Sequence, residues 1–135
     1  MKIILIAFSV FFYAHAMAGP IDSLLNTYQG QGAGDFDAVR GKEFWQKKYA
    51  FSKEPKSRNC QTCHGEKLTE AGKHVQSGKP IKPMSPVVNV ERLTDIKKIE
   101  KWFKRNCKFT LGRECTPQEK GDVLAFLILQ NKQER

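Results

Sequence analysis

Residues 58–67 read RNCQTCHGEK, and this stretch decides which fold the chain is expected to adopt. Cys60 and Cys63 are separated by two residues, and His64 follows the second cysteine directly. The spacing Cys-x-x-Cys-His is typical of covalent haem attachment, because two thiols can add to the haem vinyl groups while the adjacent histidine reaches the iron. A zinc half-site and a redox dithiol share this short pattern, so the rest of the chain must decide.

The N-terminus has the pattern of a secretory signal peptide. Residues 1–20 read MKIILIAFSVFFYAHAMAGP, in which one lysine precedes an apolar run from Ile3 to Tyr13 and small residues follow. Cleavage is expected after Ala18, and Ala16 offers a second site. The apolar run is shorter than the roughly 20 residues that span a bilayer. We therefore predict a signal peptide over residues 1–18, a periplasmic location and no stable membrane insertion of the mature chain.

Export changes how the cysteines are interpreted. An oxidising compartment permits disulfides and argues against a cytosolic thiol site, and bacterial c-type haem is attached outside the cytoplasm. The motif and the signal support each other, so we expect one covalent haem c held by Cys60 and Cys63, with His64 as the proximal iron ligand. A zinc site would also need Cys107 and Cys115, whose seven-residue gap fits a zinc-binding pair poorly.

Length and charge limit the size of the domain and the kind of partner. The chain has 135 residues and a formal charge of +9, which loss of the signal lowers by one. The mature chain suffices for one small domain with a modest core, to which a haem would add an apolar centre. A basic surface fits an acidic protein, lipid headgroups or nucleic acid, or simply keeps the protein soluble. The exported location argues against nucleic acid.

The first part of the mature chain is expected to contain a flexible segment and then a helix. Residues 19–34 end in YQGQGAG, and its glycines indicate flexibility. A helix is predicted over about 35–49, with Asp35 as its N-cap and Val39 on its apolar side. Gly41 would allow another backbone to approach this helix closely.

Two further helices are predicted after a proline-rich loop. Residues 77–93 hold three prolines and no helical period, so this loop, with Met84, is expected to line the haem edge. A helix with Thr94 as N-cap places Asn106 on its apolar face, near its end. The last helix starts with a capping box at Thr116 and Glu119. Since no strand is predicted, the fold class is all-α.

These stretches resemble the sphaeroides haem protein (SHP) family of monohaem cytochromes c. The resemblance lies in CQTCH, GKPIKPMSPVVNVERLTD, GKEFW and above all in the block KIEKWFKRNCKFTLGRECTPQEKGDVLAFL. It implies a class I cytochrome c fold over residues 35–135, with N- and C-terminal helices packed around one covalent haem. It also implies two electron-transfer partners, a dihaem cytochrome c and a membrane cytochrome b.

The resemblance further implies an axial histidine–asparagine pair and a disulfide. The family's asparagine directly precedes a cysteine, and here these residues are Asn106 and Cys107; the family joins that cysteine to the one at Cys115. An amide is a weak ligand better suited to ferric iron, so reduction is expected to release it. The expected function is electron transfer together with binding of O₂, NO or CO at ferrous haem.

The residues alone leave the second iron ligand open. Asn106 also suits a helix C-cap, whereas Met84 would give an ordinary histidine–methionine electron shuttle. His74 would give bis-histidine ligation, although its polar neighbours suggest an exposed or loosely packed side chain, and turn chemistry explains Asn89. The order of preference is Asn106, Met84, His74 and Asn89. Because His74 is the only spare histidine of the mature chain, no distal acid–base pair for an enzyme is evident.

Overall fold

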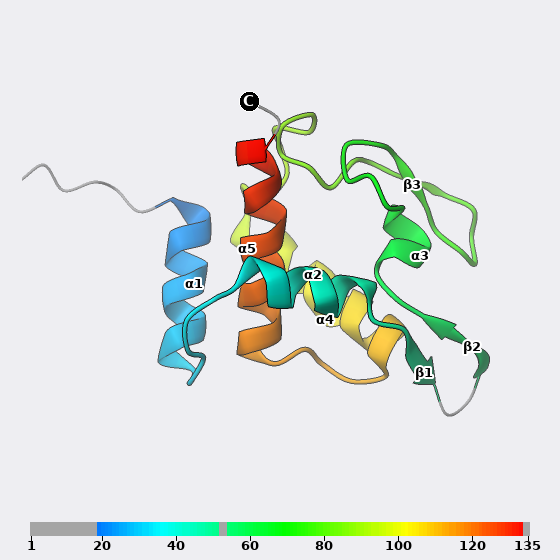
Figure 1. The fold of residues 1–135 in the computed structure, drawn as a ribbon, viewed down its shortest axis with the longest axis horizontal. Coiled ribbons are helices and arrows are strands. Elements are labelled where there is room, and N and C mark those ends of the chain that lie inside the picture. Colours follow the sequence, from blue (N-terminus) through cyan, green and yellow to red (C-terminus); the bar gives the residue numbers. More distant parts are fainter. Residues whose placement is uncertain (1–18, 52–53, 134–135) are drawn as a thin grey trace, which may run out of the picture.

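The computed structural model describes residues 19–51 and 54–133, so the predicted signal peptide lies outside the described residues (Figure 1). Within these ranges the chain forms five helices and four short strands. Their bounds are α1 Pro20–Gly30, α2 Ala38–Gln46, β1 Tyr49–Phe51, β2 Glu54–Arg58, α3 Gln61–His64, β3 Gly72–Lys73, β4 Pro80–Ile81, α4 Ile96–Leu111 and α5 Pro117–Gln133. The all-α prediction is therefore confirmed in the main.

The expected absence of strands is wrong in detail. β1 pairs antiparallel with β2, and β3 pairs antiparallel with β4, as two separate small sheets. The strands are 2 to 5 residues long. Elements this short cannot show the alternating apolar pattern from which strands are predicted.

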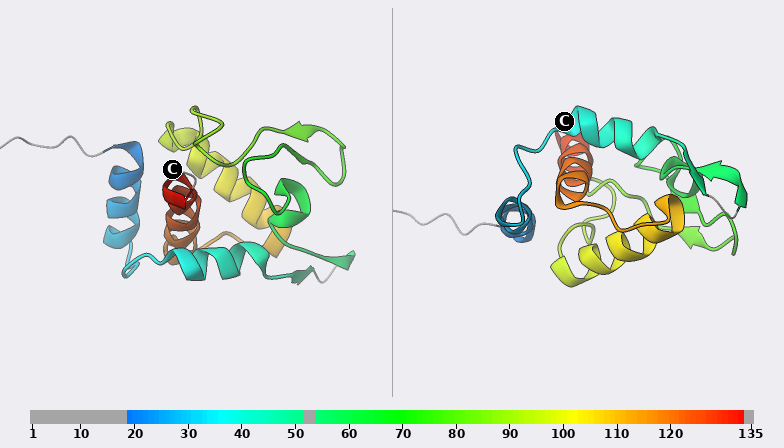
Figure 2. Two further views of the ribbon diagram at one scale, coloured as in Figure 1. Left: turned by 45° about the horizontal axis from the view of Figure 1, so that its top comes forward. Right: turned by 90° about the horizontal axis from the view of Figure 1, so that it is seen from below.

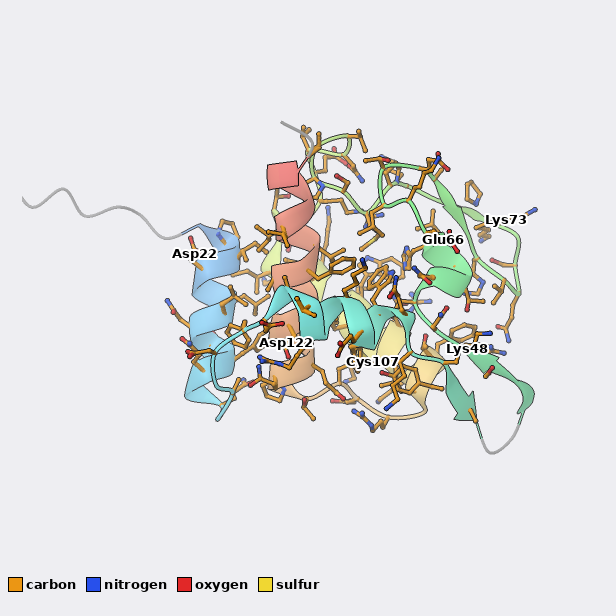
Figure 3. All side chains as sticks on the ribbon, in the orientation of Figure 1. Asp22, Lys48, Glu66, Lys73, Cys107 and Asp122 are labelled. Atoms are coloured by element: carbon orange, nitrogen blue, oxygen red, sulfur yellow. A yellow bond between two sulfur atoms is a disulfide. The ribbon has the colours of Figure 1, made fainter. Side chains whose placement is uncertain are left out.

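The crossing of α2 and α5 is the closest helix contact of the fold. A Cβ atom on Gly41 would lie 1.9 Å from the carbonyl oxygen of Asp122, so the two backbones touch there, as the sequence suggested. The Asp122 side chain is buried at this crossing (Figure 3). It accepts the backbone N–H of Asp37 at 2.8 Å and both Nε and Nη2 of Arg40 at 3.0 Å. One carboxylate thereby fixes the start of α2 on α5.

Two helices begin later than predicted. Asp37, not Asp35, caps α2 by accepting the N–H of Arg40 at 2.8 Å, so this helix is shorter than 35–49. Asp95, not Thr94, caps α4 by accepting the N–H of Lys98 at 3.0 Å. Each correct cap lies within two residues of the predicted one, and local sequence does not choose between such neighbours.

For α2 the choice is made by tertiary contacts. The carbonyl of Asp35 accepts from Arg40 and from Gln118 of α5, which holds Asp35 outside the helix. Val39 is 65% exposed and does not belong to the apolar side of α2. The α5 capping box is present as predicted: Glu119 accepts the N–H of Thr116 at 2.8 Å and donates its own N–H to the Thr116 hydroxyl at 3.2 Å.

Residues 19–34 are not the flexible segment that was expected, because most of them form α1. Leu24 and Tyr28 are one turn apart, and both are buried at 3% and 1% exposure. The Tyr28 hydroxyl donates to Glu100 of α4, whose carboxylate also accepts from Lys120 of α5 at 2.8 Å. Two apolar side chains at helical spacing thus outweigh the glycines, which gather at the end of the helix and behind it.

The core has two parts, one on each side of α5. Figure 2 shows α5 between α1 on one side and α2 and α4 on the others. The first cluster joins α2, the segment after α3, and α5, and its buried members are Trp45, Leu68, Val123, Phe126 and Leu127. The second cluster joins α1, α4 and α5, and its buried members are Leu24, Tyr28, Ile99 and Leu124. Among the described residues, no helix has both the length and the apolar character that crossing a membrane requires.

We predict that Gly41→Ala weakens the holoprotein. The new methyl group would overlap the Asp122 carbonyl oxygen, and overpacking of this kind costs about 2 kcal/mol. Gly30→Ala is the matched control, because nothing lies within 4 Å of a Cβ atom built there. Urea unfolding followed by circular dichroism should show a lower midpoint for Gly41→Ala alone. Equal midpoints would show that the helices do not touch at Gly41.

Candidate haem site

The haem motif is tied directly to the end of α2. The backbone N–H of Cys60 donates to the carbonyl of Trp45 at 3.2 Å. Asn59 donates from its side chain to the carbonyl of Gln46 at 2.8 Å, and its side-chain oxygen accepts the N–H of Thr62 at 2.8 Å. These bonds start the single turn of α3 and hold it where α2 ends.

The β3–β4 hairpin lies against the other end of the motif. A Cβ atom on Gly72 would be 2.2 Å from the carbonyl oxygen of Cys63 and 2.9 Å from the Cα of His64. Only glycine permits this approach. The motif is therefore held between α2 and the hairpin. Figure 1 shows α3, which carries the motif, next to β3 of the hairpin.

Cys60 lacks the chemistry of a redox-active thiol. Cys60 and Cys63 are partly buried and not joined to each other. Burial, with a smaller contribution from the charge of Cys63, raises the pKa of the Cys60 thiol to about 12. A redox-active cysteine needs a lowered pKa. Cys107 and Cys115 are used in a disulfide, and residues 19–51 and 54–133 contain no group of three His, Cys, Asp or Glu side chains arranged to hold a metal ion. The zinc and dithiol interpretations therefore lose their support.

His64 is neutral and enclosed. Burial, and secondly the positive charge of Arg92, lower the pKa of His64 to about 4. The imidazole is therefore uncharged at pH 7, the form that coordinates a metal. Its ring centroid lies 5.2 Å from that of Trp45. His64 Nδ1 and Trp45 Nε1 are buried without a hydrogen-bond partner among the described residues.

The donor set fits a covalently attached haem. It offers two thiols and a neutral imidazole, and the Nδ1 of that imidazole and the Nε1 of Trp45 have no hydrogen-bond partner among the described residues. An unsatisfied buried polar group costs about 1–3 kcal/mol, and a bound group with hydrogen-bonding atoms can remove such a cost. The residues that would hold the haem are Cys60, Cys63 and His64.

Asn106 differs from the sequence prediction in two respects. α4 continues five residues further, to Leu111, and ends at Gly112 with φ of 78°. Asn106 is therefore inside the helix, and its interpretation as a C-cap is wrong. Its side chain is exposed, so the prediction of a buried position is also wrong. The buried side of α4 is formed by Ile99, Cys107 and Thr110, and at about 100° per residue Asn106 lies at the margin of this side.

Phe109 shows which way this margin faces. Arg58 lies over the Phe109 ring, with its Cζ 4.3 Å from the centroid, and His74 lies 5.3 Å away, centroid to centroid. Arg58 precedes the motif by two residues, and His74 follows β3. Residues three apart share a helix side, so Asn106 lies on the side of α4 that faces the segments around the motif.

The other three candidate ligands have structural roles of their own. His74 is not loosely packed as predicted: its Nδ1 accepts the N–H groups of Gln76 at 3.3 Å and Ser77 at 3.2 Å. Met84 is partly buried and packs against the first core cluster. Asn89 donates to the carbonyl of Pro83 at 3.0 Å, in keeping with turn chemistry.

Arg92 is a site residue that sequence reasoning missed. Its Nε donates to the carbonyl of Pro83 at 2.8 Å and its Nη2 to that of Lys82 at 2.7 Å. It thereby fixes the loop that carries Met84, and its charge acts on His64. The following residue, Leu93, has a positive φ of 62°, which is rare for leucine. A lone arginine after a proline-rich stretch has no periodicity or spacing that would have identified it.

The disulfide expected from the resemblance is present. Cys107 and Cys115 are joined with an Sγ–Sγ distance of 1.96 Å, and their exposed fractions are 5% and 7%. Cys107 is inside α4, directly after Asn106 (Figure 3). Cys115 lies just before α5. The bridge therefore fixes the backbone next to Asn106 to the start of the C-terminal helix.

Comparisons with known proteins agree on one family. The family described as “Domain of unknown function (DUF1924)” matches residues 31–127. Cytochrome c-type protein SHP of Cereibacter sphaeroides is 38% identical over 117 residues, which cover 85% of this chain and 89% of that protein. Cytochrome c'' of Methylophilus methylotrophus is 32% identical over 139 residues, 97% of this chain and 96% of that protein.

The solved structures of these two relatives have the same fold. Oxidised SHP, an oxygen-binding cytochrome c, matches with a TM-score of 0.74 at 37% identity over 82% of this chain and 96% of that chain. Oxidised cytochrome c'' matches with a TM-score of 0.69 at 31% identity over 81% of this chain and 93% of that chain. The predicted class I cytochrome c fold and the resemblance to SHP are thereby confirmed.

We predict that the Cys107→Ala/Cys115→Ala variant is less stable than the wild type by about 2–3 kcal/mol, because the bridge limits the unfolded chain. Urea unfolding of the holoproteins measures the difference. As a control, wild-type protein whose disulfide has been reduced should unfold at the same urea midpoint as the double variant. In native wild-type protein neither thiol should react with an alkylating reagent before reduction. Two reactive thiols in fresh protein would contradict the bridge.

Proposed function

The chain belongs to the SHP-like family of monohaem c-type cytochromes, and we propose that it is an exported electron carrier whose reduced haem binds diatomic gases. Family membership gives the cofactor, one covalently bound haem c. When bound, the haem supplies a one-electron centre and an iron that can take a gas molecule. The residues that hold it, the second ligand, the export and the partners are parts of the proposal.

Cys60 and Cys63 form the two thioethers, and His64 binds the iron from the proximal side. This assignment is supported by the free thiols on one helical turn and by the neutral imidazole next to them. Arg92 supports the proximal side, because it keeps the loop over residues 82–84 in place. Its positive charge also disfavours protonation of His64, and so keeps the imidazole available as a ligand.

Asn106 is the second ligand, and it leaves the iron on reduction. The observation that supports this assignment is the contact of Phe109 with both Arg58 and His74, because Asn106 lies about one turn before Phe109 on α4. An amide oxygen is a hard, weak donor that prefers ferric iron. The disulfide at Cys107 fixes the backbone to which it returns.

Two known relatives support gas binding and ligand release. SHP is an oxygen-binding cytochrome c. The solution structure of cytochrome c'' gave insights into the structural basis of haem-ligand detachment. We transfer both properties to this chain as proposals: Asn106 detaches, and O₂, NO or CO takes its place. The alternative is a conventional electron shuttle with Met84 as the second ligand.

The proposed electron donors are a dihaem cytochrome c and a membrane cytochrome b, in the periplasm. The proposal rests on the family resemblance and on the sequence of residues 1–18, which has the pattern of a signal peptide. Turnover of a substrate is not part of the proposal. His74, the one spare histidine of the mature chain, already accepts two backbone N–H groups with its Nδ1.

We predict covalent attachment at Cys60 and Cys63. Protein from a host that matures c-type cytochromes should show, by intact mass, one haem added to the chain without residues 1–18. Cys60→Ala/Cys63→Ala should lose the covalent haem, whereas Cys107→Ala/Cys115→Ala should keep it. Haem that extracts from the wild type into acidified acetone would contradict the assignment.

We predict that Asn106→Val opens the ferric sixth position to added azide and leaves attachment intact, because valine has no donor atom. The reduced wild type should be high-spin and should bind CO without having to displace a strong ligand. Absorption spectra of the ferric, ferrous and CO-treated proteins measure the azide binding and the CO binding. Met84→Leu is the matched control and should change little. The reverse pattern, with Met84→Leu opening the site and Asn106→Val silent, would support the methionine-ligated shuttle instead.

A further inference from the structure

The outward side of α4 carries a concentrated set of cations. Ile99 and Cys107 mark the buried side of this helix. On the opposite side lie exposed basic side chains within an arc of about 120°, at about 100° per residue. We call this set the α4 basic face, and it consists of Lys97, Lys98, Lys101, Lys104, Arg105 and Lys108.

Protein carboxylates neutralise little of this face. Within the described residues, the ion pair of Lys108 with Glu114 at 3.1 Å is the one such contact of these six side chains. The single acid of α4, Glu100, is engaged by Tyr28 and Lys120 on the core side. The side-chain hydrogen bond and charge of Lys108, together with the charge of Lys104, hold the pKa of Glu114 below its usual range. The α4 basic face thus produces a positive potential at the surface.

This arrangement costs helix stability. Lys97 and Lys101 are four residues apart, as are Lys101 and Arg105, and like charges at this spacing destabilise a helix by about 0.2–0.5 kcal/mol per pair. A glutamate at one of each pair would stabilise α4 instead. Helix stability therefore does not explain this charge pattern.

The Arg105 edge of the α4 basic face lies nearest to the margin of α4 that carries Asn106, whereas Lys97, Lys101 and Lys104 lie on the far side of the helix from Asn106. Trp102 lies between the cations and Asn106 in the order of side chains around the helix. The Arg105 guanidinium lies over the Trp102 ring, 5.1 Å from its centroid. Asn106 is one turn further along the same margin. A partner that docks across the Arg105 edge would therefore lie close to Trp102, which separates this edge from Asn106 around the helix.

We propose that the α4 basic face docks an acidic protein that exchanges electrons with this cytochrome. The electron exchange rests on the proposed function; the docking surface rests on the charge distribution of α4. Figure 2 shows α4 along one edge of the molecule, with its outer side turned away from α2 and α5. A negatively charged protein surface is the complement that neutralises exposed lysines without burying them deeply. A lipid surface fits less well, because the apolar side of α4, including Ile99, is turned into the core.

Docking of this kind acts mainly on the association rate. Complementary charges speed encounter by about 10- to 1,000-fold at low salt. Salt screens the effect, because the Debye length falls to about 10 Å at 0.1 M ionic strength. The two proteins then need no tight complex, which suits a carrier that must leave after each electron.

The test measures electron transfer from a small acidic donor, reduced flavodoxin, to the ferric holoprotein by stopped flow. The variant reverses three charges of the α4 basic face, Lys97→Glu, Lys101→Glu and Lys104→Glu. The matched control reverses three exposed lysines elsewhere, Lys42→Glu, Lys73→Glu and Lys79→Glu. Both variants carry the same net charge, so a difference between them reports on the location of the charges.

We expect the second-order rate constant of the α4 variant to fall by about tenfold or more at low salt, and that of the control by less than about threefold. The difference should vanish at high ionic strength. Equal slowing of both variants would overturn the proposal, since net charge alone would explain the rates. Binding of the wild type to phosphatidylglycerol vesicles through these lysines, with unchanged flavodoxin rates in the α4 variant, would overturn it in favour of a lipid surface. CO binding by the reduced proteins tests the proposed function separately, because it involves no residue of the α4 basic face.

Discussion

The contact on which the rest of the structure depends is the crossing of α2 and α5 at Gly41. Because Gly41 has no side chain, the Asp122 carbonyl oxygen can lie so close to the α2 backbone that a Cβ atom at position 41 would overlap it. The buried Asp122 carboxylate then satisfies the first turn of α2 and the Arg40 guanidinium together. α2 can take only one position on α5, and the haem motif follows from it, since Cys60 is hydrogen-bonded to the carbonyl of Trp45 at the end of α2.

The opposite wall of the site is set by α4, through contacts far from the motif in sequence. Glu100 binds Tyr28 of α1 and Lys120 of α5, which fixes the first half of the helix. The Cys107–Cys115 bridge fixes the second half. Asn106 lies directly before the bridge, so its backbone is held while its side chain is exposed. If Asn106 is the second iron ligand, as we propose, the bridge would hold the backbone to which it returns after each detachment.

Several features could be predicted from the sequence because they depend on spacing within a few residues. The haem motif, the α5 capping box and the role of Gly41 are of this kind. The errors lie where two nearby residues offer the same local chemistry or where distant contacts decide. Asp37 replaces Asp35 as a cap because Arg40 and Gln118 hold the carbonyl of Asp35. Arg92 cannot be predicted locally, because its partners are loop carbonyls. The flexibility expected for residues 19–34 is wrong because the glycines obscure the helical spacing of Leu24 and Tyr28.

A helix presents a different set of residues in each direction, so α4 can serve the core, the proposed iron ligand and the proposed docking surface together. One side holds the core through Ile99, a second carries Asn106 toward the motif, and the third carries the α4 basic face. Since a helix is rigid over its length, the contacts that fix the core side also fix the other two. The position of the proposed iron ligand and that of the proposed docking surface are therefore not independent. A shift of α4 that moves Asn106 would also move the cations, so the proposed ligand release and the proposed docking would be coupled through this helix.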